Sequence, residues 1–329
     1  KVNVENVICF SSKTMPILSI LRKNLFENIN TQIIYKDELP KCFDVETIKR
    51  IYGYNFELMK INSNEKFEKF NGCTILLNNA DECLPQELGF DADFIISMYA
   101  NFGCVIFVYS QNSESYISEI QHVRRRESIA MTPRDCFTTL NNMIEISDLS
   151  NNVKSSKALT LSSIKEITNS FGDASVGSSG LSVQYAILMG LIHYSLDNYK
   201  GKNIKLIVPP NCYGGTNDQA RRVAACIKNV EILDLAVDSG EDMVDSVESV
   251  LDQVAKLDAV PFIIAEIPTN PRVEVPNLVK LSEALSKKRK TTDNIYSIPP
   301  VFILDQTFCP NVKFLGDLDI LSDIKTISY

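Results

Sequence analysis

The sequence predicts an α/β protein with a mostly parallel sheet and helices on both faces. Three observations support this fold class. Short apolar runs alternate with helix-period segments along the chain, which is the pattern of repeated βαβ units. Some runs, such as residues 301–304, are apolar at every position, as expected of parallel strands buried on both faces. Polar residues follow the ends of these runs, where open α/β sheets bind their ligands.

The alternation continues through both halves of the chain. In the first half, strands are expected over 7–10, 31–35, 56–61, 74–77, 94–97 and 105–109, and helices over 15–24, 45–52, 116–126 and from 131 onward. In the second half, strands are expected over 204–208, 230–235, 261–266 and 301–304, and helices over 181–199, 219–228, 243–257 and 277–287. Residues 149–157, rich in Ser, Asn and Lys, are interpreted as a linker. The sequence therefore predicts two domains, 1–149 and 150–329.

Composition and charge exclude several classes of protein. The chain has 329 residues, 45% hydrophobic and 22% charged, and a net charge of -8, which argues against nucleic acid as a partner. It has no apolar run of the roughly 18 residues that a membrane helix needs. The nine cysteines include no C-x-x-C pair, and there are only two histidines, so we expect reduced thiols in a cytoplasmic protein and no metal. Because the first residue is not Met, we expect a piece of a longer chain.

The two halves resemble each other. Residues 9–13 echo 176–180, each before a helix, and residues 75–80 echo 302–307. Residues 84–99, from Leu84-Pro85 onward, echo the tail that ends at Tyr329. The second copy has Gly180 and Asp305 where the first has Lys13 and Asn78. We interpret the first half as a degenerate partial copy that kept the scaffold and lost the chemistry.

Two loops of the second half offer a phosphate cradle and an aromatic ring. Residues 178–181, Ser-Ser-Gly-Leu, place small residues and backbone N–H groups at a helix start, where an anion can bind. The alternative is an ordinary helix cap. Tyr213 precedes Gly214 and Gly215, which would let the backbone turn sharply and hold the ring over a planar ligand. The alternative is a tyrosine that packs on a turn.

Two further loops offer an amide and a carboxylate. Asn270 lies between Pro268 and Pro271, after a buried strand, so its position is fixed. Asp305 follows the apolar run 301–304 and supplies a negative charge; alternatively it only caps a turn. A phosphate cradle, a stacking ring, an amide and a carboxylate together are what pyridoxal 5'-phosphate requires.

In this order, the motifs resemble the Cys/Met metabolism family of pyridoxal-phosphate-dependent enzymes, which includes cystathionine gamma-synthase, cystathionine lyase and methionine gamma-lyase. The matching motifs are Ser-Ser-Gly-Leu at 178–181, Tyr-Gly-Gly-Thr at 213–216, Pro-Thr-Asn-Pro at 268–271 and Asp-Gln-Thr-Phe-Cys-Pro at 305–310. The resemblance implies the large domain of a type I pyridoxal-phosphate-dependent transferase, similar to aspartate aminotransferase.

The resemblance also implies a role for each matching residue. Ser179, Gly180 and Leu181 would hold the phosphate, Tyr213 would stack on the ring and assist proton transfer, Asn270 would contact the phenolic oxygen, Asp305 would pair with the pyridinium, and Thr307 and Ser328 would lie beside the cofactor. Ser328 matches the serine three residues before the family's Schiff-base lysine, which is therefore expected just after Tyr329. Lys325, three residues after Ser322, is the alternative.

The first half matches the family less well. Residues 91–97 look like the strand that leads to the lysine, but Ala100 and Asn101 stand where a lysine is needed. Residues 120–135 resemble the segment after that strand. Residues 1–149 are therefore expected to be structural or to lie at a subunit interface.

The implied function is a transsulfuration-type reaction on an amino acid, by elimination or replacement at the β or γ carbon, in a homodimer or homotetramer. Two alternatives remain: a non-catalytic family member that acts as a scaffold or regulatory subunit, and another reaction of the same fold, such as transamination.

Overall fold

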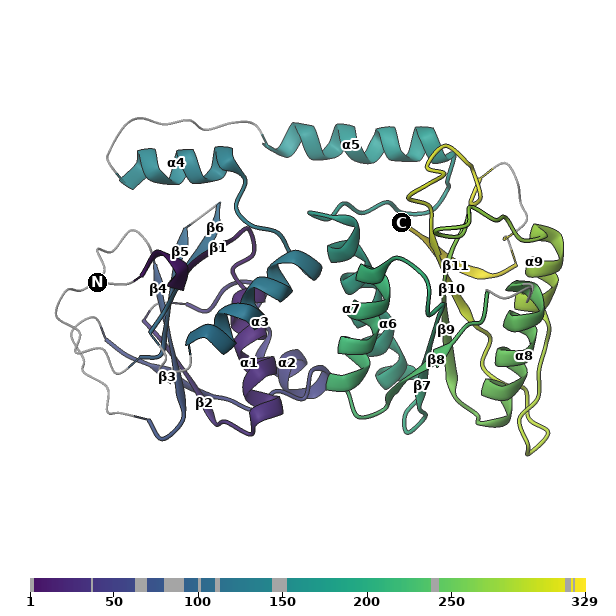
Figure 1. Cartoon of the computed structure of the whole chain (residues 1–329), viewed down its shortest axis with the longest axis horizontal. Helices are drawn as coiled ribbons and strands as arrows, with labels where there is room; N and C mark the ends of the chain where they lie inside the picture. The colour runs from purple at the N-terminus through teal and green to yellow at the C-terminus, as the bar shows by residue number, and fades with distance from the viewer. Residues whose placement is uncertain are drawn as a thin grey trace. The chain divides into compact units, whose positions relative to one another are not determined.

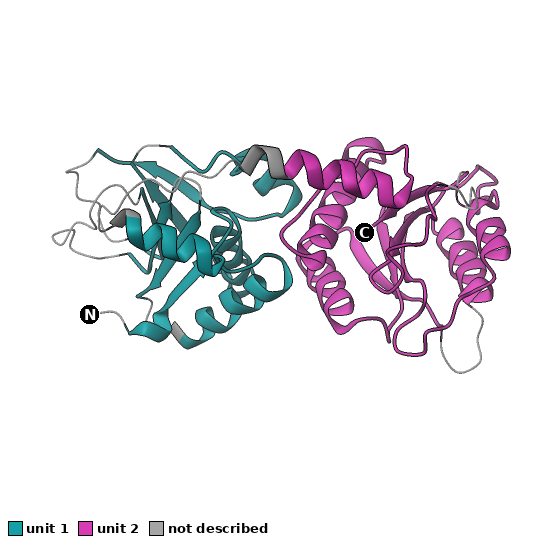
Figure 2. Cartoon of the chain, turned by 90° about the horizontal axis from the view of Figure 1, so that it is seen from above, with its two compact units in different colours: residues 1–151 teal, residues 152–329 magenta. Residues whose placement is uncertain are grey.

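The computed structural model describes residues 3–36, 38–62, 70–79, 92–99, 102–109, 113–143, 153–237, 243–316, 321 and 323–329. The chain forms two compact units, residues 1–151 and 152–329 (Figure 2). One unit contains a mixed sheet and the other a parallel sheet, and helices pack on the sheets. The predicted α/β class is therefore confirmed.

Unit 1 contains a six-stranded sheet in the order β1-β6-β5-β4-β2-β3 (Figure 1). Its strands are β1 (Val7–Phe10), β2 (Thr31–Tyr35), β3 (Glu57–Lys60), β4 (Cys73–Asn79), β5 (Phe94–Tyr99) and β6 (Gly103–Val108). Its helices are η1 (Val4–Asn6), α1 (Met15–Glu27), α2 (Val45–Ile51), α3 (Ser113–Arg126) and α4 (Pro133–Met143). The strands pair in parallel except β6, which is antiparallel to β1 and β5. The mostly parallel sheet expected from the sequence thus contains one antiparallel strand, β6, between β1 and β5.

A glycine and an ion pair stabilise the folding of this unit. Gly103 begins β6 with φ +117, and a Cβ there would lie 2.0 Å from the Phe10 carbonyl oxygen, so only glycine fits. In the core, both terminal nitrogens of Arg22 donate to the Glu127 carboxylate, at 2.6 and 2.5 Å.

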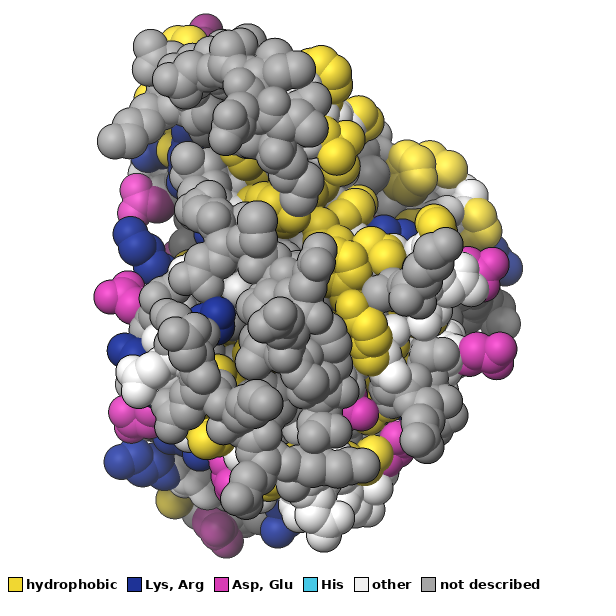
Figure 3. All heavy atoms as spheres, turned by 90° about the vertical axis from the view of Figure 1, so that its left-hand side faces the viewer, with side chains coloured by type: hydrophobic (Ala, Val, Ile, Leu, Met, Phe, Trp, Pro, Cys, Tyr) yellow, Lys and Arg dark blue, Asp and Glu magenta, His cyan; other side chains and the backbone are white. Residues whose placement is uncertain are grey.

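Some apolar side chains of unit 1 remain exposed, among them Phe137 and Leu140 of α4. Figure 3, which faces unit 1, shows hydrophobic side chains at the surface.

Unit 2 contains a five-stranded parallel sheet in the order β11-β10-β9-β7-β8. Its strands are β7 (Ile204–Val208), β8 (Val230–Asp234), β9 (Val260–Glu266), β10 (Val301–Asp305) and β11 (Lys325–Ser328). Its helices are α5 (Val153–Thr168), α6 (Gly180–Asn198), α7 (Gly214–Cys226), α8 (Met243–Lys256) and α9 (Leu278–Ser286). Helices α6 and α7 cover one face of the sheet, and α8 and α9 cover the other (Figure 1).

The two sheets share a strand order. In unit 1 the parallel strands run β5-β4-β2-β3, and in unit 2 they run β11-β10-β9-β7-β8, which is the same order with β9 added. A helix precedes the first strand of each series, α1 before β2 and α6 before β7. The order is that expected of two copies. The copy relation stays a prediction, now supported by shared topology.

Most predicted elements are present, but several details were wrong. The predicted linker overlaps α5, which is helical from Val153. Helix α7 begins at Gly214 rather than near Gln219, so Gly214 and Gly215 open a helix instead of forming a sharp loop. Leu84-Pro85, Ala100 and Asn101, and residues 149–152 lie outside the described residues.

The cysteines that the structure describes are free, and Cys73, Cys104 and Cys212 among them are buried. Within the described ranges, no helix is long and apolar enough to span a membrane.

Candidate functional site

The candidate site lies at the carboxyl edge of the sheet in unit 2. Because its strands are parallel, they all end at this edge. Glu266 ends β9 directly beside Asp305, which ends β10. Ser328 ends β11 beside Leu304, which brings Tyr329 level with Asp305. The sheet therefore gathers two acidic side chains and a phenol.

Asp305 is a buried carboxylate with neutral partners. It is 8% exposed. Its Oδ1 accepts hydrogen bonds from the Thr307 backbone N–H at 2.9 Å and from the Thr307 hydroxyl at 2.6 Å. Among the described side chains, no lysine or arginine forms an ion pair with it. A buried carboxylate normally has a cationic partner, so this group suits a positively charged ligand.

Glu266 holds the backbone of Tyr213. It is 5% exposed, and its Oε1 accepts the Tyr213 backbone N–H at 2.7 Å. Burial raises the pKa of Glu266 and the neighbouring Asp305 raises it further, while the backbone N–H groups of Tyr213 and Asn270 oppose the shift. Tyr213 is 49% exposed.

The start of α6 is a capped helix N-terminus. Ser179 is the N-cap: its hydroxyl accepts the Ser182 N–H at 3.2 Å, and the Ser182 hydroxyl accepts the Ser179 N–H at 2.9 Å. The capping alternative is therefore correct for the Ser179 hydroxyl. The first N–H groups of a helix, here those of Gly180 and Leu181, have no partner within the helix, and the space beside Gly180 is open.

Gln184 joins three parts of the site. It lies on α6 and is fully buried, and its Oε1 accepts hydrogen bonds from the Thr216 hydroxyl at 3.0 Å and the Tyr329 hydroxyl at 2.7 Å. A second link runs from the Gln219 side-chain amide to the Leu181 carbonyl, at 2.8 Å. These bonds fasten the starts of α6 and α7 to the end of β11.

The structure brings most of the predicted residues to this edge. The Thr307 hydroxyl donates a hydrogen bond to Asp305. Asn270 is half-buried, and its backbone N–H donates to Glu266. Ser328 donates to the Gln306 side chain. The roles predicted for these residues toward a cofactor stay predictions.

Lys325 lies at the wrong edge. It pairs with Val301, where β10 begins, whereas Asp305 ends that strand. Four residues of strand span about 13 Å. The hypothesis that Lys325 is the Schiff-base lysine is therefore wrong on geometry.

Two residues of the site were missed by sequence reasoning. Gln184 had one signal, an amide within an otherwise apolar helix. Glu266 had another, since it is an acidic residue that ends an apolar strand in the same way as Asp305.

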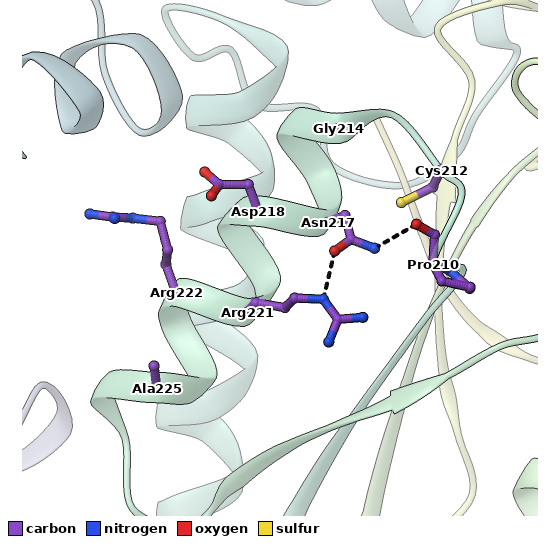
Figure 4. A pocket seen from close by; sticks show the side chains of 8 residues that line it. All are labelled: Pro210, Cys212, Gly214, Asn217, Asp218, Arg221, Arg222 and Ala225. Atoms are coloured by element: carbon purple, nitrogen blue, oxygen red, sulfur yellow. Dashed lines mark hydrogen bonds between the residues drawn. The ribbon is translucent and has the colours of Figure 1, made fainter.

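A pocket of about 510 Å³ lies beside α7 (Figure 4). Asn217 bridges its walls, because its amide nitrogen donates to the Pro210 carbonyl at 3.2 Å and its oxygen accepts from Arg221 at 2.6 Å. The Arg221 guanidinium also donates to Asp234 at 2.7 Å. Cys212 lines the pocket, and burial raises the pKa of its thiol to about 12, with Glu266 adding to the shift.

Fold and geometry define an α/β protein with a candidate ligand site at the carboxyl edge of a parallel sheet. No protein-family model and no curated protein matches the chain. Solved structures that resemble it include a cystathione gamma lyase of Micromonospora echinospora, with a TM-score of 0.33, 16% identity and coverage of 49% of this chain and 35% of that one. Another is metB of Corynebacterium glutamicum, with a TM-score of 0.31, 16% identity and coverage of 46% and 32%.

A third is the O-acetylhomoserine sulfhydrylase of Wolinella succinogenes, with a TM-score of 0.30, 19% identity and coverage of 46% and 38%. The chain thus spans about a third of the length of these proteins.

Proposed function

We propose that unit 2 binds pyridoxal 5'-phosphate at the carboxyl edge of its sheet and belongs to an enzyme of sulfur amino-acid metabolism. The observation that carries the proposal is Asp305, a buried carboxylate whose partners are neutral donors. A protonated pyridine nitrogen is a cation of suitable size for it. The Cys/Met metabolism family and the type I fold are part of this proposal.

The side chains around Asp305 suit the rest of the cofactor. The N–H groups of Gly180 and Leu181 would hold the phosphate at the positive end of α6. The half-exposed Tyr213 ring would stack on the pyridine, and Asn270 would reach its phenolic oxygen. Thr307 holds Asp305 in place through two hydrogen bonds to Oδ1, and the Tyr329 hydroxyl also hydrogen-bonds this carboxylate.

When bound, pyridoxal phosphate supplies an electron sink for reactions at the carbons of an amino acid. The residues of this chain bind and orient it. Buried Asp305 would keep the ring nitrogen protonated, and the Tyr213 hydroxyl would move a proton at the face of the ring on which it stacks. The nucleophilic lysine that the resemblance requires would follow Ser328, which ends β11 at this edge.

Substitution of Asp305 tests cofactor binding. A charged hydrogen bond contributes about 1.5–3 kcal/mol, so Asp305→Asn should weaken binding of pyridoxal phosphate about 10- to 100-fold in equilibrium dialysis. Asp245→Asn, an exposed carboxylate on α8, is the matched control and should bind as the wild type does. Equal affinity of the Asp305 variant and the wild type would refute the assignment.

The runner-up is a cofactor-binding family member that serves as a scaffold or regulatory subunit. It is favoured by the place of Lys325 at the opposite edge of the sheet. The two are separated by incubating the cofactor-loaded protein, extended past Tyr329 to include the expected lysine, with cystathionine and measuring released thiol and 2-oxo acid. Release supports the enzyme, and cofactor binding without release supports the scaffold.

A further inference from the structure

Tyr213 is held on both sides of its backbone while its ring stays free. Its carbonyl oxygen accepts the N–H groups of Thr216 at 2.9 Å and Asn217 at 3.2 Å, in the first turn of α7. Its own N–H donates to Glu266, which ends strand β9. The residue as a whole is 49% exposed. The position of the ring is therefore set by what holds the backbone.

A buried carboxylate is a costly acceptor for the backbone N–H groups of Tyr213 and Asn270. A neutral amide would accept the same hydrogen bond from Tyr213 without a buried charge. Glu266 is buried next to a second carboxylate, Asp305, which disfavours its charge. A charged acceptor does form a shorter and stronger bond than a neutral one. The side chain is thus suited to fixing Tyr213 firmly rather than to filling space.

We infer that Glu266 is a positioning residue whose carboxylate fixes the backbone of Tyr213 and so keeps the phenol ring where it stacks on a pyridine ring. This inference rests on the proposed function and adds to it a residue that does not touch the cofactor.

The hold of Glu266 on Tyr213 depends on pH. Glu266 faces Asp305 from β10, Cys212 from the end of β7 and Tyr329 from the end of β11. Burial raises the pKa of Cys212 to about 12 and also raises that of Tyr329, so both are neutral where Glu266 titrates. Because the pKa of Glu266 is itself raised, the bond is strongest above that pKa. It weakens as the pH falls through it, at a higher pH than for an ordinary glutamate.

The first test needs no cofactor. The full chain is labelled with ¹⁵N-tyrosine, the Tyr213 amide is identified by its loss in Tyr213→Phe, and its proton shift is followed against pH. We expect an inflection in the wild type that is absent from Glu266→Gln and kept in the control Glu283→Gln, an exposed residue of α9. A wild-type shift that is flat with pH, or an inflection that survives in Glu266→Gln, would overturn the inference.

The second test uses pyridoxamine 5'-phosphate, whose fluorescence reports binding. Glu266→Gln should weaken its affinity about 3- to 10-fold, as expected when a charged acceptor becomes neutral, and should flatten the pH profile of the dissociation constant. An unchanged constant and profile would contradict the inference. If the wild type binds no pyridoxamine phosphate while its Tyr213 amide titrates with Glu266, the proposed function is wrong and the positioning of Tyr213 stands.

Discussion

Gln184→Leu should destabilise unit 2, although the leucine side chain has a volume similar to that of glutamine. The substitution removes the acceptor of two hydroxyl groups, those of Thr216 and Tyr329, in a place where Gln184 is fully buried and Thr216 is 1% exposed. A buried polar group left without a partner costs about 1–3 kcal/mol. Two such groups would cost up to about 6 kcal/mol if they acted independently.

The two hydroxyls are not independent. Thr216 and Tyr329 also contact each other, and Tyr329 contacts Asp305, so once Gln184 is gone Thr216 can donate to Tyr329 and Tyr329 to Asp305. Both hydroxyls then keep an acceptor, and we expect a loss of about 1–2 kcal/mol in the free energy of opening. Adding Thr216→Val removes one of the two hydroxyls that lost Gln184 and should cost less than it does in the wild type, which makes the pair of changes non-additive.

Native-state hydrogen exchange measures the loss in the opening free energy of unit 2 separately from unit 1. The slowest amides of β7 and β9 report the opening of unit 2, which avoids treating the two-unit chain as a two-state folder. Gln253→Leu, an exposed glutamine of α8, is the control and should change the opening free energy by less than about 0.5 kcal/mol. If Gln184→Leu behaves as this control does, or if Thr216→Val adds its full cost, Gln184 does not join the site as described.

Two further predictions follow from burial and charge. Arg22→Met should cost about 3–5 kcal/mol in the opening free energy of unit 1, read from hydrogen exchange of the slowest β4 and β5 amides, because Glu127 would be left buried and charged. Arg22→Met with Glu127→Met should cost far less, and equal losses would be contrary to this account. At pH 8, iodoacetamide should alkylate the exposed Cys42 and spare Cys212 in the folded chain, as read by mass spectrometry, because a thiol with a pKa of about 12 is about 1 part in 10⁴ thiolate at that pH; equal rates for the two would speak against the buried environment of Cys212.

The sequence predicted the central strands well because β4, β5, β7, β9 and β10 are short apolar runs buried on both faces. Residues 301–304 were recognised in this way, and the parallel order of the strands then brings Tyr213 and Asp305 to one edge. The burial of a strand can be predicted locally, because it requires a run of consecutive apolar residues.

The errors arose where tertiary contacts override local preference. Gly214 and Gly215 are poor helix formers, yet they begin α7 because Glu266 fixes the residue before them. The first turn of α5 was interpreted as part of a linker over 149–157, because this stretch is rich in serine and lysine and poor in apolar residues. Gln184 and Glu266 carry no motif, and their partners lie far away in sequence, at Tyr329 and Tyr213.

The shared strand order has a consequence for engineering. In unit 1, β2 pairs directly with β4, whereas in unit 2 β9 separates β7 from β10. Glu266 ends β9, and Asn270 follows it in the next loop. Unit 1 therefore has no place in its sheet for the strand that supplies these two groups. Changing Asn78 to aspartate would restore a charge there but not a site, and a grafted pocket would need a whole helix-strand-helix insertion.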